Sequence, residues 1–211
     1  MIPSIAFASC YIYAPGGRCE VSERSRSLCA LLKAGDARLI RKYAQCVKQH
    51  ARACPPIAGF FSSSDVLVPV PGSQATGTLC GSVAGLLAEA LVREGLAADH
   101  CDCIRRVWPV RKSATAAPRE RPSVERHYDS MAVELTCVSV DPAHLTLVDD
   151  VVTRGRTLLA AATRLHDAFP RARIQAFALL RTMGFAPRVD RLLDPCIGEI
   201  AWRGGDARRT P

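Results

Sequence analysis

The chain has 211 residues, 48 % of them hydrophobic and 23 % charged, which is typical of a globular protein with one sizeable core and excludes a disordered chain. Its formal net charge of +8 favours an anionic partner, and a nucleic acid, a membrane surface and a polyphosphate small molecule all carry the required charge. Basic residues are scattered except near 105–126 and 203–211, no nucleic-acid-binding motif is present, and no apolar stretch approaches the roughly 20 residues that span a bilayer. We therefore favour a small molecule over a nucleic acid and expect no membrane partner.

The N-terminal segment, residues 1–60, is expected to precede a core formed by residues 61–211. It starts without the basic residues that precede the apolar part of an export signal, so we expect a cytoplasmic protein. The stretch AFASCYIYAPGGRCEV predicts a short hairpin, and apolar residues at helical spacing predict helices over 23–35 and 36–50. Asp36 lies between the two helices and is expected to cap the second.

Ten cysteines are spread along the chain without a CxxC pair. Structural zinc sites use two close cysteine pairs, so we expect no such site. A free thiol among apolar neighbours behaves as a small hydrophobic side chain, and we expect these cysteines to be free thiols in a reducing compartment.

Beyond residue 60, stretches with strand and helix patterns alternate. In chain order, the expected elements are a strand at 65–70, a helix from 79 to about 95, a strand within 101–110, a long mobile loop over 111–130, a strand at 145–148, a helix over 158–169, and strands at 173–180 and 197–202. This alternation predicts an α/β fold with a mainly parallel central sheet flanked by helices. In such sheets ligands bind beyond the carboxyl ends of the strands.

One such end carries the segment LTLVDDVVTRGRTLL, residues 145–159. Asp149 and Asp150 follow the apolar strand, and a helix is expected to begin near Gly155. Free backbone N–H groups at a helix start bind phosphate, and a glycine allows close approach. Thr153 and Thr157 add hydroxyl donors, and Arg154 and Arg156 add positive charge. Two carboxylates would repel the phosphate itself, so we expect them to accept hydrogen bonds from sugar hydroxyls on the same ligand.

This segment resembles the 5-phosphoribosyl 1-diphosphate (PRPP) motif of the type I phosphoribosyltransferases, which has four apolar residues, two acids, two apolar residues and Thr-Thr-Gly-x-Thr. The chain reads LTLV-DD-VV-TRGRT, with Arg154 in place of the second threonine. VLVPVPGSQATG is similar to the pyrophosphate loop of the family, and residues 105–130 lie where the family has its flexible hood. The arrangement is most similar to the ComF-like amidophosphoribosyltransferase branch, without the paired cysteines of that branch's zinc module and without its RGFNQ-like segment.

The resemblance implies a type I phosphoribosyltransferase fold and a cytoplasmic transferase of nucleotide metabolism, commonly a homodimer, that uses PRPP with Mg²⁺. It implies that Asp149 and Asp150 hold the ribose hydroxyls and that residues 153–157 hold the 5-phosphate. Gly72, Ser73 and Gln74 would hold the pyrophosphate with magnesium. The hood residues Arg111 and Lys112 would close over the departing pyrophosphate, and residues 1–60 would lie on the side of an unidentified nitrogen acceptor.

Several alternatives stay open from the residues alone. An acid pair at the end of a strand also occurs in solvated turns and helix caps, and Gly72 and Ser73 also suit a simple turn. The same site in a protein without catalysis would make a sensor of PRPP or of a nucleotide. A nucleic-acid-binding domain without a small-molecule site remains a third alternative.

Overall fold

The computed structural model describes residues 1–75, 81–111, 120–137, 142–184 and 188–211. The strands are β1 (Ser4–Tyr13), β2 (Val66–Pro69), β3 (Asp99–His100), β4 (Ile104–Arg106), β5 (Met131–Val133), β6 (His144–Val152), β7 (Arg173–Thr182), β8 (Leu193–Arg203) and β9 (Asp206–Thr210). The α-helices are α1 (Glu20–Lys33), α2 (Ala37–Ala53), α3 (Pro55–Ala58), α4 (Val83–Arg93), α5 (Val124–Asp129) and α6 (Arg156–Ala168), and a 3₁₀ helix covers Leu135–Cys137. None of the helices in the described part of the chain is long and apolar enough to cross a membrane.

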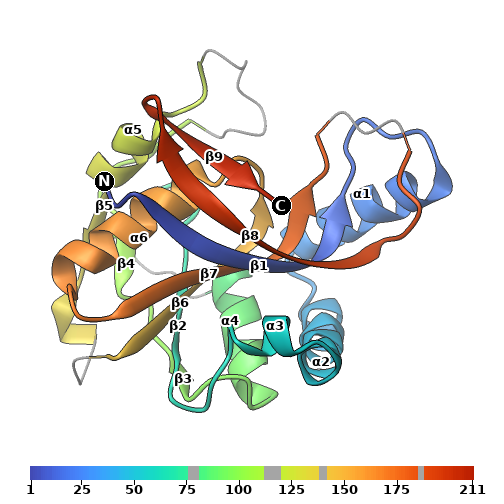
Figure 1. The fold of residues 1–211 in the computed structure, drawn as a ribbon, viewed down its shortest axis with the longest axis horizontal. Coiled ribbons are helices and arrows are strands. Elements are labelled where there is room, and N and C mark those ends of the chain that lie inside the picture. The colour runs from blue at the N-terminus through green and yellow to red at the C-terminus, as the bar shows by residue number, and fades with distance from the viewer. Residues whose placement is uncertain (76–80, 112–119, 138–141, 185–187) are drawn as a thin grey trace.

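A seven-stranded mixed sheet organises the molecule, with the strand order β3-β2-β6-β7-β1-β8-β9 (Figure 1). The first five strands in this order run parallel to one another, whereas β8 and β9 are antiparallel to their neighbours. The sequence prediction of an α/β fold with a mainly parallel sheet is therefore confirmed. Because β2 and β6 are parallel neighbours, the segments that follow both strands leave the same edge of the sheet.

Helices cover both faces of this sheet, as Figure 1 shows. On one face, α1 to α4 pack on alternate strand residues such as Leu67, Val148 and Phe177. On the other face, α5 and α6 pack on the strand residues that point to the opposite side, such as Val68 and Leu147. Because successive strand residues point to opposite faces, a strand that is covered on both sides needs a nearly continuous apolar run. The run LTLV of β6 meets this requirement, and residues 145–148 are all buried.

The predicted N-terminal hairpin is wrong. The structure forms a single long strand, β1, which lies between β7 and β8 inside the central sheet. Residues 7–12 of this strand are all buried, which is typical of an inner strand covered on both faces. The chain then turns through Ala14–Gly17 and enters α1.

The helices of the N-terminal segment are confirmed within a few residues. Asp36 caps α2 as predicted, and its Oδ1 atom accepts hydrogen bonds from the N–H groups of Arg38 and Leu39 at 2.9 and 3.0 Å. The predicted strand at 65–70 is β2, and the described part of the helix that follows it is α4. The apolar residues at helical spacing and the carboxylate at the cap position were sufficient to predict α1 and α2 from the sequence.

The structure differs from the sequence prediction between residues 101 and 130. Only Ile104–Arg106 of the predicted strand is extended, and it pairs with β5 in a separate two-stranded sheet. The predicted long mobile loop contains the helix α5, which Ser123 caps by accepting a hydrogen bond from the N–H group of Arg126. The low apolar content of this stretch hid the helix, although Ser123 is a typical cap residue.

Candidate functional site

Two segments with predicted ligand-binding residues meet at the carboxyl edge of the sheet. Residues 70–75 follow β2, and Asp149 and Asp150 lie near the end of the neighbouring strand β6. The Val70 N–H group donates a hydrogen bond to the Val148 carbonyl at 2.9 Å and ties the two segments together. The structure therefore brings the predicted pyrophosphate loop next to the predicted ribose-binding acids, although they lie more than 70 residues apart in the sequence.

Asp150 has a basic partner on α1. Its Oδ2 atom lies 2.8 Å from the Lys33 Nζ atom, with the carboxylate mostly covered and the lysine half exposed. Burial lowers the pKa of Lys33, but the Asp150 carboxylate outweighs this effect and raises the pKa above its usual value. The last turn of α1 thus contributes a cation to the acid pair, a contact that no sequence motif indicated.

Asp149 is the less compensated member of the pair. Burial, the neighbouring charge of Asp150 and a hydrogen bond between the two side chains raise the pKa of Asp149 well above its usual value. Its Oδ1 atom accepts a hydrogen bond from the Asp150 N–H group at 2.9 Å. Two adjacent carboxylates of which one holds its proton more tightly can both accept and donate hydrogen bonds, which suits a pair of neighbouring hydroxyl groups.

The start of α6 has the conformation that the phosphate-loop prediction requires. Gly155 occupies the cap position in the left-handed region, with a φ of 86°, and no side chain caps the helix. A Cβ atom at this position would lie 2.6–2.8 Å from the Ile200 side chain of β8, so glycine is required both by the backbone and by the space. The first N–H groups of the helix have no partner within it and point out of its amino end.

Arg154 and Arg156 flank this helix start, and both pair with Asp206 of β9. The Arg156 Nε and Nη2 atoms lie 2.5 and 2.6 Å from the two carboxylate oxygens, and Arg154 Nη1 lies 3.1 Å from Oδ2. These contacts raise the pKa of Arg156 and lower the pKa of Asp206. Arg154, where the segment departs from the family pattern, thus has an acidic partner on β9. Thr153 is exposed and Thr157 partly exposed beside them.

The buried side chain of Arg106 binds the predicted pyrophosphate loop, although the sequence did not indicate this residue. Arg106 of β4 is 4 % exposed, and its Nε atom donates to the Gly72 carbonyl. Its Nη1 atom donates to Ser130 Oγ, and its Nη2 atom lies 3.2 Å from His127 Nδ1. Gly72 and Gln74 themselves are exposed and Ser73 is partly exposed, so their outer side is accessible.

The predicted hood residues are only partly described. Arg111 lies 3.0 Å from Glu120, with both side chains about half exposed, and Lys112 lies outside the described residues. The Val110 N–H group donates to the Ser73 carbonyl at 2.8 Å. The beginning of the predicted hood is therefore attached to the predicted pyrophosphate loop.

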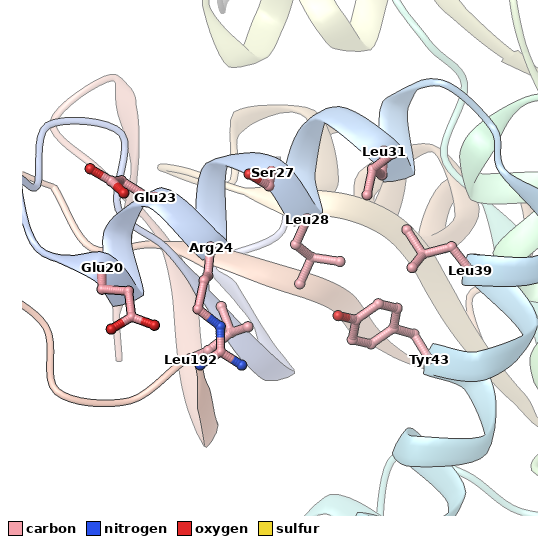
Figure 2. Close-up of a pocket in the computed structure, with 9 residues that line it drawn as sticks. All are labelled: Glu20, Glu23, Arg24, Ser27, Leu28, Leu31, Leu39, Tyr43 and Leu192. Atoms are coloured by element: carbon pink, nitrogen blue, oxygen red, sulfur yellow. The ribbon is translucent and has the colours of Figure 1, made fainter.

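Figure 2 shows a second feature, an open groove of about 410 Å³ beside α1. Its walls are Glu20, Glu23, Arg24, Ser27, Leu28 and Leu31 of α1, Leu39 and Tyr43 of α2, and Leu192. The leucines of α1 face Leu39 and Tyr43 across it, and the charged residues lie at its other end (Figure 2). The lining includes no predicted site residue, so the groove is separate from the acid pair.

The sequence matches no protein-family model, and no curated protein matches it. Function is therefore inferred from the chemistry of the residues that the fold brings together.

The donor set fits a magnesium ion that arrives with its ligand. Asp149 and Asp150 offer the hard carboxylate oxygens that Mg²⁺ and its bound waters prefer. Across the described ranges, no group of three or more His, Cys, Asp or Glu side chains is arranged to hold a metal ion. Eight cysteines of the described ranges are not in disulfides, and four of these lie between residues 19 and 54.

Proposed function

We propose that the protein is a phosphoribosyltransferase that binds PRPP with Mg²⁺ and transfers the phosphoribosyl group to a nitrogen acceptor with release of pyrophosphate. One observation carries this proposal: the acid pair of β6, the glycine-initiated start of α6 and the loop after β2 meet at one edge of a parallel sheet. A ligand with vicinal hydroxyls between two phosphorylated ends matches this order of acceptors and donors.

The proposed roles follow from the geometry of each group. The N–H groups at the start of α6 would bind the 5-phosphate, and the carboxyl groups of Asp149 and Asp150 would accept hydrogen bonds from the ribose hydroxyl groups. The loop after β2 would bind the pyrophosphate. The C1–O bond breaks and its electron pair leaves with pyrophosphate, while a C1–N bond forms and the acceptor nitrogen loses a proton. Negative charge beside C1 would stabilise the positive charge that develops on the sugar.

Magnesium would be bound by oxygens of PRPP itself and would reduce the negative charge of the leaving pyrophosphate. The protein's own contribution is positioning and charge.

The double substitution Asp149→Asn with Asp150→Asn tests the proposal. We expect the dissociation constant of Mg-PRPP, measured by isothermal titration calorimetry, to rise by about 100-fold or more, since two charge-assisted hydrogen-bond acceptors are lost. Asp99→Asn is the matched control, because Asp99 is an exposed carboxylate of β3 that lies beside Val66 at the amino end of β2, whereas the acid pair lies at the carboxyl ends of the strands. Equal binding of Mg-PRPP by wild type and double variant would sink the proposal.

A measurement of pyrophosphate release distinguishes a phosphoribosyltransferase from a protein that only senses PRPP. A screen of nitrogen nucleophiles with wild-type protein and Mg-PRPP is expected to give acceptor-dependent pyrophosphate release. Tight binding without release by any acceptor, and without slow hydrolysis of PRPP, would favour the regulatory function. Dimer formation remains a prediction that sedimentation measurements would check.

A further inference from the structure

Arg106 is a buried cation without an acidic partner. It lies at the end of β4, and none of the ion pairs in the described part of the chain includes it. Its hydrogen-bond partners among the described residues are a carbonyl, a hydroxyl and a histidine ring nitrogen. Burial lowers the pKa of the guanidinium to about 10, and the charge of Asp149 opposes this effect. Burial lowers the pKa of His127 to about 3, with help from Arg106 and Arg156, so the ring is neutral and accepts the hydrogen bond at neutral pH.

Such an arrangement lowers the stability of the protein, because burying a charge without an opposite charge is unfavourable. Residues that reduce stability in this way are commonly explained by function. The charge of Arg106 lies directly beneath the exposed loop Gly72–Gln74, where an anion on the outer side of the loop would compensate it.

The contacts also fix the direction of the loop's peptide groups. In a planar trans peptide the carbonyl and the following N–H group point in opposite directions. The Gly72 carbonyl faces Arg106, so the Ser73 N–H group points away from it. The Ser73 carbonyl accepts from the Val110 N–H group, so the Gln74 N–H group points away from Val110. Within the described ranges neither N–H group has a hydrogen-bond partner.

We infer that Arg106 is a positioning residue for pyrophosphate: it holds the Gly72 carbonyl inward, directs the Ser73 N–H group outward and supplies positive charge beneath the loop, while the Val110 contact orients the Gln74 N–H group. This inference rests on the proposed function, since it assigns the pyrophosphate end of PRPP to this loop. His127 and Ser130 hold the guanidinium in place from α5 and from the residue that follows it.

Three probes separate this role from a structural one: Mg-pyrophosphate, Mg-PRPP and ribose 5-phosphate, each titrated by calorimetry. For Arg106→Met we expect the affinities for both pyrophosphate-containing probes to fall by about tenfold or more, and the affinity for ribose 5-phosphate to change by less than about twofold. Arg106→Lys keeps the charge but not the three fixed donors, and is expected to give an intermediate loss. Arg105→Met is the matched control, since Arg105 is the exposed neighbour on the same strand and pairs with Glu134 at 2.8 Å.

Unchanged binding of Mg-pyrophosphate by Arg106→Met, or an equal loss for all three probes, would overturn the inference. If Arg106→Met does not fold, Arg106→Lys decides, and full affinity in that variant overturns the positioning role. The proposed function fails separately. In that case wild type binds Mg-pyrophosphate in an Arg106-dependent way, but Asp149→Asn with Asp150→Asn leaves Mg-PRPP binding unchanged.

Discussion

Asp149 and Asp150 are neighbours on one strand, yet their charges are compensated unequally. Lys33 pairs with Asp150 at 2.8 Å, whereas Asp149 is in none of the ion pairs of the described residues. Lys33 also lowers the pKa of Asp149, but burial and the charge of Asp150 outweigh this effect. The free protein therefore keeps one carboxylate in an unfavourable environment. A ligand that supplies hydroxyl donors and a bound cation would relieve this unfavourable burial.

The substitution Asp149→Asn is accordingly expected to stabilise the protein while it weakens binding. Because the pKa of Asp149 is raised on folding, the folded state holds its proton more tightly, and the stability of wild type decreases as pH rises above the ordinary carboxyl range. We expect a gain of about 1 kcal/mol, or roughly 2–4 °C in Tm, near pH 7. The gain should disappear near pH 4, where the unfolded chain is also protonated.

Thermal unfolding of both proteins between pH 4 and pH 8 measures this difference. Asp99→Asn, at the amino end of the parallel strands, controls for a general effect of removing one negative charge. A lower Tm for Asp149→Asn at every pH would contradict the prediction.

Gly155 is expected to be intolerant of any side chain. Gly155→Ala adds a left-handed backbone strain and a Cβ contact with Ile200 at 2.6–2.8 Å, and together these are expected to reduce the free energy of unfolding by about 2–4 kcal/mol. Gly95→Ala is the matched control, because Gly95 has a φ of 76° and open space around it. Urea unfolding should give a loss of only about 1 kcal/mol there. Equal losses at the two positions would mean that the contact with Ile200 has no effect.

At this scale the sequence identified the residues that are close together in the chain. The acid pair and Gly155 fall within one short segment, and their chemistry can be recognised from their order. Arg106 could not be found in the same way, because it is one of 28 lysines and arginines and its importance depends on contacts with residues 72, 127 and 130. The Asp206 partner of Arg154 lies 52 positions further along the chain.

Among the elements, β9 has the most direct influence on the start of α6. The carboxylate of Asp206 binds both Arg154 and Arg156, and Arg156 Nη1 also donates to the Pro122 carbonyl at 3.2 Å. The Arg156 side chain thus connects the start of α6 with the edge strand β9 and with the segment that precedes α5. The contact supports the loop without using a threonine at position 154.

Asp206→Asn is expected to reduce the free energy of unfolding by about 1 kcal/mol at pH 7, a modest value because the pair is partly exposed to solvent. The pKa of Asp206 is lowered in the folded state, so its contribution is present above the ordinary carboxyl pKa and is lost as pH falls through the lowered value. The difference between wild type and variant should therefore close in acid.

Urea unfolding at pH 7 and near pH 3 measures this closure. Asp190→Asn serves as the control, because Asp190 is 90 % exposed and lies 3.7 Å from an equally exposed Arg188. A difference of the same size at both pH values would show that charge is not the cause.

The elements that sequence reasoning placed correctly are those with a regular apolar period and a clear cap or turn. The strand β1 was mistaken for half of a hairpin because the glycines that follow it suggested a tight turn. Its neighbours β7 and β8 lie more than 150 residues away in the sequence, and no local pattern specifies such a pairing. The short strand β4 was expected in the central sheet, but it pairs with β5 in a separate sheet. A local sequence pattern can indicate a strand without indicating which strand it pairs with.

For the whole molecule, composition and alternation were sufficient to predict an α/β sheet with helices on both faces. They did not predict that a strand from the N-terminal segment would lie inside the sheet or that two antiparallel strands would extend it. Sheet order depends on which apolar faces pack together in three dimensions. Some of the basic residues, such as Arg154 and Arg156, are in structural ion pairs, so the number of basic residues is weak support for a nucleic-acid partner.

The Asp206 contact has a consequence for how the molecule opens. Edge strands are among the first parts of a sheet to unfold locally, and amides that share an opening event exchange their hydrogens at a common rate. Because Asp206 joins β9 to the start of α6, separation of this strand would also release the two arginines. Amide exchange in residues 154–157 would then follow that of β9 rather than that of the middle of α6, and the candidate phosphate loop would open as part of the sheet edge.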